Sequence, residues 1–395
     1  MKRVFFTVAG LLLLLISCSP IKPNTPGATG PGHLGTWITT SSMIGFPRDN
    51  PVAANGWLYA IGAIDNNIIT PSRIRYSPYP FYSLPLGAVP TTQTTLLFTM
   101  LTTVQAAPIN PDGSLGTWIT ETSLPLTDTT TASPYGDLYD PVRTTTSNSY
   151  LYAFFTQATW YSPINPDGSL GQWQQTIPLP KLMPFTVTYC SGFFTITSLY
   201  DPLITEYNGF IYALFTQSTW FTRLNPNGSL SPWQAGVSFT SPVIGATSFA
   251  TDNYLYLIGQ VLDNTYSPIA VSGYKIYKAA INPDGSLGVW TFEGEWKLFE
   301  LPEVIIPYND WIYAYQWPSL SIINEVQRIP INQDGSLGKA LVDTSTLFAS
   351  PFAGVAYNGY LYAFGGYPVT QTSHGDYYAI GNDFTTTIEY TTISP

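Results

Sequence analysis

The chain has 395 residues, of which 45% are hydrophobic and 15% aromatic, while only 10% are charged. Soluble proteins carry about 25% charged residues, so this composition excludes a disordered acidic chain and a charged helical array. Acidic residues outnumber basic ones by 24 to 14. A nucleic-acid partner is therefore not expected, because the chain has no excess of cations with which to hold a phosphate backbone. The many aromatics, with 32 glycines and 34 prolines, favour short strands joined by turns.

The first 17 residues have the pattern of a signal peptide. Lys2 and Arg3 precede an apolar run over residues 4–16, which is shorter than the ~20 residues that span a bilayer. The segment 15–18, Leu-Ile-Ser-Cys, resembles the lipobox of bacterial lipoproteins, and this resemblance implies that Cys18 becomes the lipidated N-terminus. Residues 18–32 then form a Pro-rich tether. We expect an extracytoplasmic protein held in the bacterial cell envelope, at the outer membrane or cell surface, through Cys18; the alternative is a plain signal peptide with a chance cysteine.

A turn motif recurs along the rest of the chain. Its consensus is Asn-Pro-Asp-Gly-Ser-Leu-Gly-x-Trp, in which the proline presets the first φ angle and the glycine takes a left-handed conformation. The motif therefore predicts a hairpin turn followed by an outer strand. Clear copies lie at 110–118, 165–173, 225–233 and 282–290, and degraded copies at 332–338 and 32–37.

A strand motif, Asn-Gly-aromatic-Leu-Tyr-Ala, recurs between these turns. Its continuous apolar character indicates a central strand that is covered on both faces. Six copies lie at 55–60, 148–153, 208–213, 253–257, 309–314 and 358–363, and a weaker seventh at 94–99. Counting seven copies, the spacing from Leu58 to Leu361 averages about 50 residues, which is the period of propeller repeats.

The segment 358–366, Asn-Gly-Tyr-Leu-Tyr-Ala-Phe-Gly-Gly, resembles the kelch-repeat strand that ends in a double glycine. The Trp after each turn falls at the kelch outer-strand position, and the resemblance covers about residues 34–390. The double glycine survives only once, so the repeats are divergent. The sequence thus predicts an all-β protein whose residues 33–395 form a monomeric seven-bladed β-propeller of four-stranded antiparallel blades.

Two chain ends compete to complete the last blade, whose third strand is expected at 377–381. Closing the ring removes an open sheet edge. The N-terminal segment around Trp37 matches the other outer strands, and the C-terminal segment 386–390 is the alternative for the same place. We favour the N-terminal segment because it carries the turn motif.

The sequence offers little for metal or cofactor chemistry. His33 and His374 are the only histidines, whereas the copper radical oxidases among kelch-type propellers need two in one site. Each copy of the turn motif has a single aspartate, and one copy has Asn227 instead. A calcium ion needs six to eight oxygen ligands, so the turn aspartates are interpreted as structural rather than as calcium ligands. Cys190 has no second cysteine in the folded part and is interpreted as a buried thiol. No cofactor and no metal are expected.

Candidate functional residues fall in insertions between the strands. Asp140 and Asp201 follow tyrosines in two related segments, 136–141 and 198–202, that precede central strands of consecutive blades. Two facing carboxylates would permit glycoside hydrolysis, although the turn-forming role of an Asp-Pro pair is the simpler explanation. Aromatic residues near the mouth of the ring would suit a carbohydrate or protein ligand: Tyr139, Tyr200, Tyr79, Tyr82 and Trp317.

We therefore expect a surface-anchored, non-catalytic binding or scaffolding propeller for a carbohydrate or protein partner. Its ligand residues would be those aromatics with Asp140 and Asp201. The alternative is an extracellular carbohydrate-active hydrolase that uses Asp140 and Asp201 as its paired carboxylates.

Overall fold

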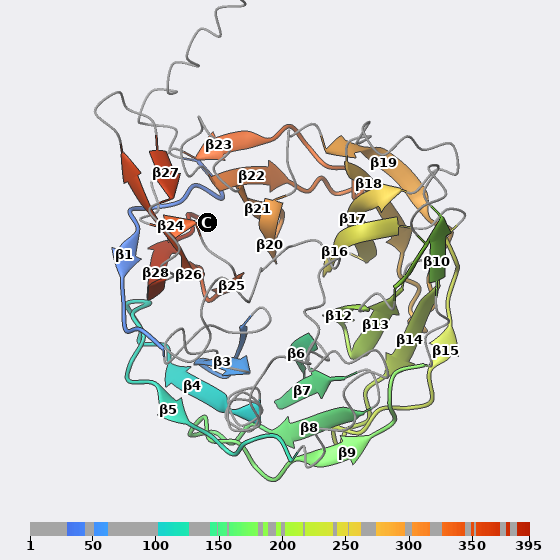
Figure 1. Cartoon of the computed structure of the whole chain (residues 1–395), viewed down its shortest axis with the longest axis horizontal. Helices are drawn as coiled ribbons and strands as arrows, with labels where there is room; N and C mark the ends of the chain where they lie inside the picture. Colours follow the sequence, from blue (N-terminus) through green and yellow to red (C-terminus); the bar gives the residue numbers. More distant parts are fainter. Residues whose placement is uncertain are drawn as a thin grey trace, which may run out of the picture.

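Six antiparallel blades of four strands each stand around a central axis (Figure 1); five of them are four-stranded sheets, and the sixth is the main part of a six-stranded sheet. The structure is a computed structural model. It describes residues 30–43, 51–61, 102–125, 143–147, 149–155, 158–180, 185–188, 195–198, 202–215, 218–239, 243–251, 253–261, 274–296, 302–316, 326–343, 349–350, 353–371, 377–379 and 385–395. In five of the blades the strands run in chain order from the axis outward and each pairs with the next, whereas the sixth takes its outermost strand from the N-terminal end of the chain.

The first three blades use consecutive strands. Blade 1 contains β2 (Val52–Ala54), β3 (Trp57–Ile61), β4 (Val104–Pro108) and β5 (Ile119–Thr120). Blade 2 contains β6 (Arg143–Ser147), β7 (Tyr150–Phe154), β8 (Thr159–Pro163) and β9 (Gln174–Thr176). Blade 3 contains β12 (Leu203–Tyr207), β13 (Phe210–Leu214), β14 (Thr219–Arg223) and β15 (Gln234–Ala235).

The last three blades include the one that joins both ends of the chain. Blade 4 contains β16 (Val243–Thr251), β17 (Tyr254–Val261), β18 (Tyr274–Ala280) and β19 (Thr291–Trp296). Blade 5 contains β20 (Pro302–Tyr308), β21 (Trp311–Gln316), β22 (Val326–Pro330) and β23 (Leu341–Asp343). Blade 6 contains β25 (Ala353–Tyr357), β26 (Tyr360–Gln371), β28 (Thr385–Thr392) and β1 (Ile38–Thr39).

The prediction of seven blades is wrong, because the weak motif copy at 94–99 does not begin a blade of its own. Strand β3 pairs directly with β4, with Leu58 opposite Ala107, so residues 62–103 connect the second and third strands of blade 1. The copy itself lies outside the described residues. Its sequence already differs where it matters, since Thr94-Thr95 replaces Asn-Gly and Phe98 replaces the tyrosine.

The N-terminal segment closes the ring, as expected. Strand β1 is the outermost strand of blade 6, where Ile38 pairs with Tyr390. The C-terminal strand β28 does not compete for this place, because it is the third strand of the same blade. The expectation of a third strand at 377–381 is therefore wrong: β27 (Tyr377–Ala379) pairs with the distal part of β26, where Val369 lies opposite Ala379. The 12-residue β26 is long enough to pair with both.

The hydrophobic core lies between neighbouring blades. Alternate side chains of each central strand point to opposite neighbours, so Leu58 packs in a cluster with Tyr362 of blade 6 while Tyr59 packs with Leu151 of blade 2. This explains why the strand motif is apolar throughout. The motif tyrosines Tyr59, Tyr152, Tyr212, Tyr256, Tyr313 and Tyr362 are all fully buried.

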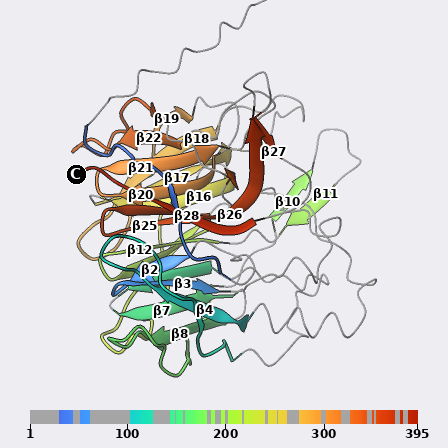
Figure 2. The ribbon, with the colours of Figure 1, turned by 90° about the vertical axis from the view of Figure 1, so that its left-hand side faces the viewer.

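The ring has two different ends. We call the end that carries the hairpins at 110–114, 165–169, 225–229, 282–286 and 332–336 the turn end. At the opposite end, the loop end, each second strand finishes and each third strand begins. Seen edge-on, the hairpin of β10 (Phe185–Thr188) and β11 (Thr195–Ser198) and the strand β27 project on the side away from the C-terminus (Figure 2). The turn end is thus short and regular, whereas strands extend beyond the blades at the loop end.

Candidate functional site

Each hairpin at the turn end is held by its own polar side chains. In the first copy the amide of Gly113 donates to the carbonyl of Asn110 (2.9 Å). One oxygen of Asp112 accepts from both the amide (3.0 Å) and the hydroxyl (2.7 Å) of Ser114. These bonds hold the pKa of the Asp112 carboxyl below its usual value. Asn227 makes the same two bonds to Ser229, so the turn does not need the charge.

A second set of contacts joins every blade to the next one. The buried tyrosine of each central strand donates to the carbonyl of a turn glycine in the following blade, so six such bonds run around the ring. Burial also raises the pKa of five of them, Tyr59, Tyr152, Tyr212, Tyr313 and Tyr362. The pairs are Tyr59–Gly168 (2.8 Å), Tyr152–Gly228 (2.9 Å), Tyr212–Gly285 (3.1 Å), Tyr256–Gly335 (2.7 Å), Tyr313–Gly32 (2.9 Å) and Tyr362–Gly113 (2.9 Å).

The aromatic residue of the strand motif covers the same turn glycine. A Cβ atom on Gly168 would overlap the ring of Trp57, and the φ angle of Gly168 is +83°, a left-handed value that favours glycine. The strand motif of one blade and the turn motif of the next are therefore two halves of one contact. The six pairs are Trp57–Gly168, Tyr150–Gly228, Phe210–Gly285, Tyr254–Gly335, Trp311–Gly32 and Tyr360–Gly113.

Beside this contact, five of the six blades place one of two kinds of side chain opposite the tyrosine, whereas blade 1 has Ala106 there. In blades 2, 3 and 6 the residue opposite the tyrosine on the third strand is aromatic and stacks on it, as Tyr161 does on Tyr152 at 6.1 Å. In blades 4 and 5 that residue is Lys278 or Arg328. Each of these cations donates to the carbonyl before the next turn glycine and lies over the covering aromatic ring.

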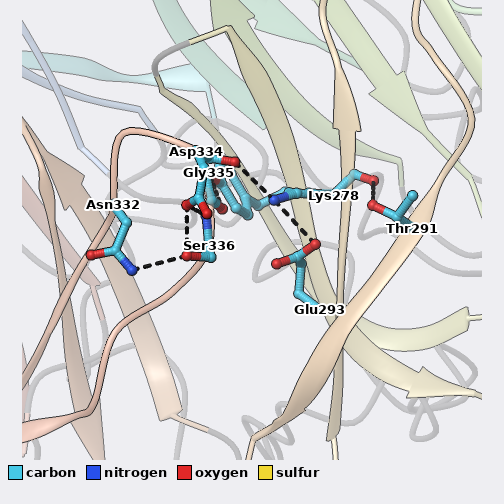
Figure 3. Close-up of polar contacts among 8 residues, drawn as sticks. Lys278, Thr291, Glu293, Asn332, Asp334, Gly335 and Ser336 are labelled. Atoms are coloured by element: carbon cyan, nitrogen blue, oxygen red, sulfur yellow. Dashed lines mark hydrogen bonds and ion pairs between the residues drawn. The ribbon is translucent and has the colours of Figure 1, made fainter.

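Figure 3 shows the cationic junction of blades 4 and 5. Lys278 Nζ donates to the carbonyl of Asp334 (3.1 Å) and lies 3.1 Å from Glu293 Oε1 of the outer strand. The side chains of Lys278 and Glu293 are only 14% and 16% exposed, so the pair is partly shielded from water. The Lys278 ammonium therefore serves the blade junction rather than an open site.

At the blade 5–6 junction the N-terminal segment is fixed by a buried carboxylate. Asp343 Oδ2 accepts from the amide of Leu34 (3.0 Å) and lies 3.0 Å from His33 Nδ1. Arg328 donates to the carbonyl of Pro31 (2.8 Å), and its Nε lies 3.9 Å from the same Asp343 oxygen. His33 thus helps to close the ring. This role of Asp343 was not predicted from the sequence, because His33 and Leu34 lie some 300 positions away in the chain.

Glu206 is another carboxylate taken up by a blade junction. In blades 5 and 6 the innermost strand ends in a tyrosine whose hydroxyl accepts a hydrogen bond from a backbone amide of the next blade. The amide of Gly56 donates to Tyr357 (2.9 Å), and that of Gly359 donates to Tyr308 (2.6 Å). Blade 2 has the short Ser147 at that position, and Glu206 accepts from both Ser147 Oγ (2.7 Å) and the amide of Gly209 (3.1 Å). Burial raises the pKa of Glu206.

A cavity of about 960 Å³ opens at the turn end between blades 3 and 4. It brings Arg223 near the carboxylates of Glu206 and Asp284, but Glu206 already accepts from Ser147 across a blade junction and Asp284 from Ser286 within its own turn. Among the residues that the structure describes, no three histidine, cysteine or acidic side chains come together as a metal site. The lining residues are Glu206, Asn208, Gly209, Phe210, Phe221, Arg223, Leu224, Gln234, Pro283 and Asp284.

The residues that the sequence singled out for ligand binding lie outside the described ranges, and so does Cys18. The strand ends that flank them nevertheless share one place. Tyr79 and Tyr82 fall between β3 and β4, Tyr139 and Asp140 directly precede β6, Tyr200 and Asp201 precede β12, and Trp317 follows β21. All these strand ends lie at the loop end. Whether the seven side chains meet there stays a prediction.

No family model and no curated protein matches the sequence. Among solved structures, the chain is similar to that of YjhT, with 10% identity, coverage of 59% of this chain and 73% of that chain, and a TM-score of 0.38. It is also similar to a Bacteroides uniformis protein named "putative 6-phosphogluconolactonase", with 12% identity, coverage of 88% and 90%, and a TM-score of 0.39. Within the described ranges no helix has the length and apolarity to cross a membrane. The chain is a six-bladed β-propeller, as its own sheets show.

Proposed function

We propose that this kelch-like propeller is a non-catalytic binding or scaffolding module that presents its loop end to a carbohydrate or protein partner. Lipidated Cys18 anchors it in the bacterial envelope. The observation that carries the proposal is the difference between the ends: the turn end is occupied by blade junctions, and every segment with a predicted ligand residue is joined to strands at the loop end. Loops on a rigid frame are the usual place for binding residues.

The connecting segments support this choice of end. At the turn end β2 and β3 are joined by only Asn55 and Gly56, whereas β3 and β4 are joined at the loop end by residues 62–103. The stability of the ring does not require so long a connection, because β3 and β4 pair as closely as the strands of other blades. Surface connections of this length in a compact domain usually serve function.

The composition of these segments suits flat or extended ligands. Tyrosine and tryptophan offer a large rigid face with a polar edge, and they are enriched where proteins contact partners. The chain has few charges overall, so recognition by stacking and hydrogen bonds fits it better than recognition by charge.

A glycan array probed with the purified protein, followed by binding assays on the best glycan, tests the proposal. Tyr139→Ala combined with Tyr200→Ala should weaken binding more than tenfold, because a buried aromatic anchor is worth ~2 kcal/mol or more. Phe292→Ala is the matched control, since Phe292 is an aromatic side chain on the outer rim that is 54% exposed. Equal loss in both variants, or hydrolysis of the bound glycan, would contradict the proposal.

Replacing Cys18 by Ser tests the anchor. The resemblance to the lipobox implies that Cys18 is diacylated and then N-acylated, and these three chains exceed the two signals needed for stable membrane attachment. The wild-type protein should partition into the detergent phase of a phase-separation extraction, and the variant into the aqueous phase. Retention of the variant with membranes would show that something other than Cys18 attaches the chain.

A further inference from the structure

We infer that the turn end is the membrane-proximal surface of the propeller, that it stands off from an anionic bilayer, and that the loop end points away from the membrane. The inference rests on the proposed lipid anchor at Cys18. It adds to the proposed function the direction in which the binding end is presented.

The N-terminal segment enters the ring at the turn end. Gly32 stands where the other blades have their turn glycine: its carbonyl accepts from Tyr313 (2.9 Å), and its φ angle is +74°. Its amide donates to the carbonyl of Ser394 (2.8 Å). Arg328 holds the preceding carbonyl of Pro31 (2.8 Å). The chain is thus fixed at the turn end from about residue 31 onward.

The remaining tether is short. Residues 18–29 number twelve, and a chain of that length spans at most about 40 Å even when fully extended. The five-residue central strands separate the turn end from the loop end by about 17 Å. A lipid at Cys18 therefore keeps the turn end, on average, closer to the bilayer than the loop end.

The charge of the turn end opposes direct contact with lipid. Asp112, Asp167, Asp284 and Asp334 are exposed there, and the serine hydrogen bonds keep their carboxyl pKa values low. Of the cations at this end, Lys278 pairs with Glu293 and Arg328 with Asp343, while the exposed Arg223 offsets only part of the four carboxylate charges. Anionic headgroups attract basic segments and repel acidic ones over about a Debye length, so the acidic turn end should be held away from them.

Energy transfer to labelled lipids measures this orientation. The lipidated full-length chain with Cys190→Ser is reconstituted into vesicles that contain an acceptor lipid, and a donor dye is placed at Asp310→Cys or Ser123→Cys. Asp310 is exposed at the turn end between β20 and β21, and Ser123 is exposed at the loop end after β5. Transfer from the turn-end dye should exceed that from the loop-end dye by about twofold or more, because the ends differ by about 17 Å.

The outcomes separate the inference from the proposed function. Failure of the protein to associate with vesicles would overturn the anchor and the orientation together. Association with equal transfer from both dyes, or greater transfer from the loop-end dye, would overturn the orientation alone and leave the anchor standing.

A charge variant tests the stand-off. Asn227 shows that asparagine preserves the turn, so Asp112→Asn, Asp167→Asn, Asp284→Asn and Asp334→Asn can be combined without loss of the hairpins. On vesicles with anionic lipid, transfer from the turn-end dye should rise in this variant. On zwitterionic vesicles it should not change. An equal signal from variant and wild type on anionic vesicles would contradict the repulsion.

Discussion

The turn end and the loop end are made from the same strands but follow different rules. At the turn end one contact is repeated six times, a tyrosine hydroxyl and an aromatic ring on a glycine of the next blade. At the loop end the described parts differ from blade to blade: β26 continues beyond its blade to pair with β24 (Ala349–Ser350) and β27, and β10 pairs with β11 outside the six blades. The repeated motifs therefore mark the end that holds the ring together, and the variable segments mark the end that is free to specialise.

The largest expected effect comes from breaking one blade junction at its glycine. Gly168→Ala places a Cβ against the ring of Trp57 at a left-handed φ, and should lower the free energy of unfolding by about 3 kcal/mol or more. Gly56→Ala has the same handedness but open space around it, and should cost about 1–2 kcal/mol. Urea unfolding of both variants measures the difference. Equal losses would mean that the junction contact contributes nothing.

The tyrosine hydroxyls should contribute less than the glycines. Tyr152→Phe removes a fully buried donor from the carbonyl of Gly228 and should cost about 1–2 kcal/mol in urea unfolding. The matched control is the loop-end pair Tyr139→Ala and Tyr200→Ala, whose free energy of unfolding should stay unchanged. If that control destabilised the protein as much as Tyr152→Phe, stability and binding would not be divided between the ends.

These tyrosines also give a pH dependence with a defined sign. Burial raises the pKa of Tyr152 above the ordinary value of 10.0. Its contribution to stability is thus fully present below about pH 10 and is lost as the pH rises through the folded-state pKa. In thermal melts Tyr152→Phe should lose stability less steeply than wild type above pH 10. A steeper loss in the variant would contradict the assignment.

The smallest effect is expected at the turn carboxylates. Asp112→Asn should leave the melting temperature at pH 7 within experimental error, because Asn227 makes the same hydrogen bonds in its own turn. The pKa of Asp112 is depressed in the folded state, so its contribution is present above the ordinary value of 3.8 and is lost as the pH falls through the folded-state pKa. The Asn variant should show a flatter acid limb below pH 4. A large loss at pH 7 would require another partner for Asp112.

The strand and turn motifs were sufficient to predict a closed propeller, but not the number of blades. The copy at 94–99 matched in hydrophobicity, but it lacked the tyrosine hydroxyl that the junction uses, and it has Thr94-Thr95 in place of the Asn, Gly or Ser residues that take positive φ in the other copies. Those uses are visible only once neighbouring blades are placed together, because each contact joins residues from different repeats. Asp343 illustrates the same limit. In its copy of the turn motif Ala340 replaces the tryptophan, and Asp343 follows three positions later; only the closed ring brings Asp343 to Leu34. The candidate ligand residues carry no such repeat and were argued from composition alone.

Hydrogen exchange of the N-terminal segment tests most directly the claim that it is part of the ring. The amides of Gly32, Gly35 and Thr40 donate to carbonyls of Ser394, Thr392 and Ile388. If this segment completes blade 6, these three amides and that of Leu34, which donates to Asp343, should open only with the whole ring and exchange as slowly as those of β26 and β28. Rapid exchange of these four amides while β26 and β28 stay protected would show that the propeller closes without its N-terminal strand.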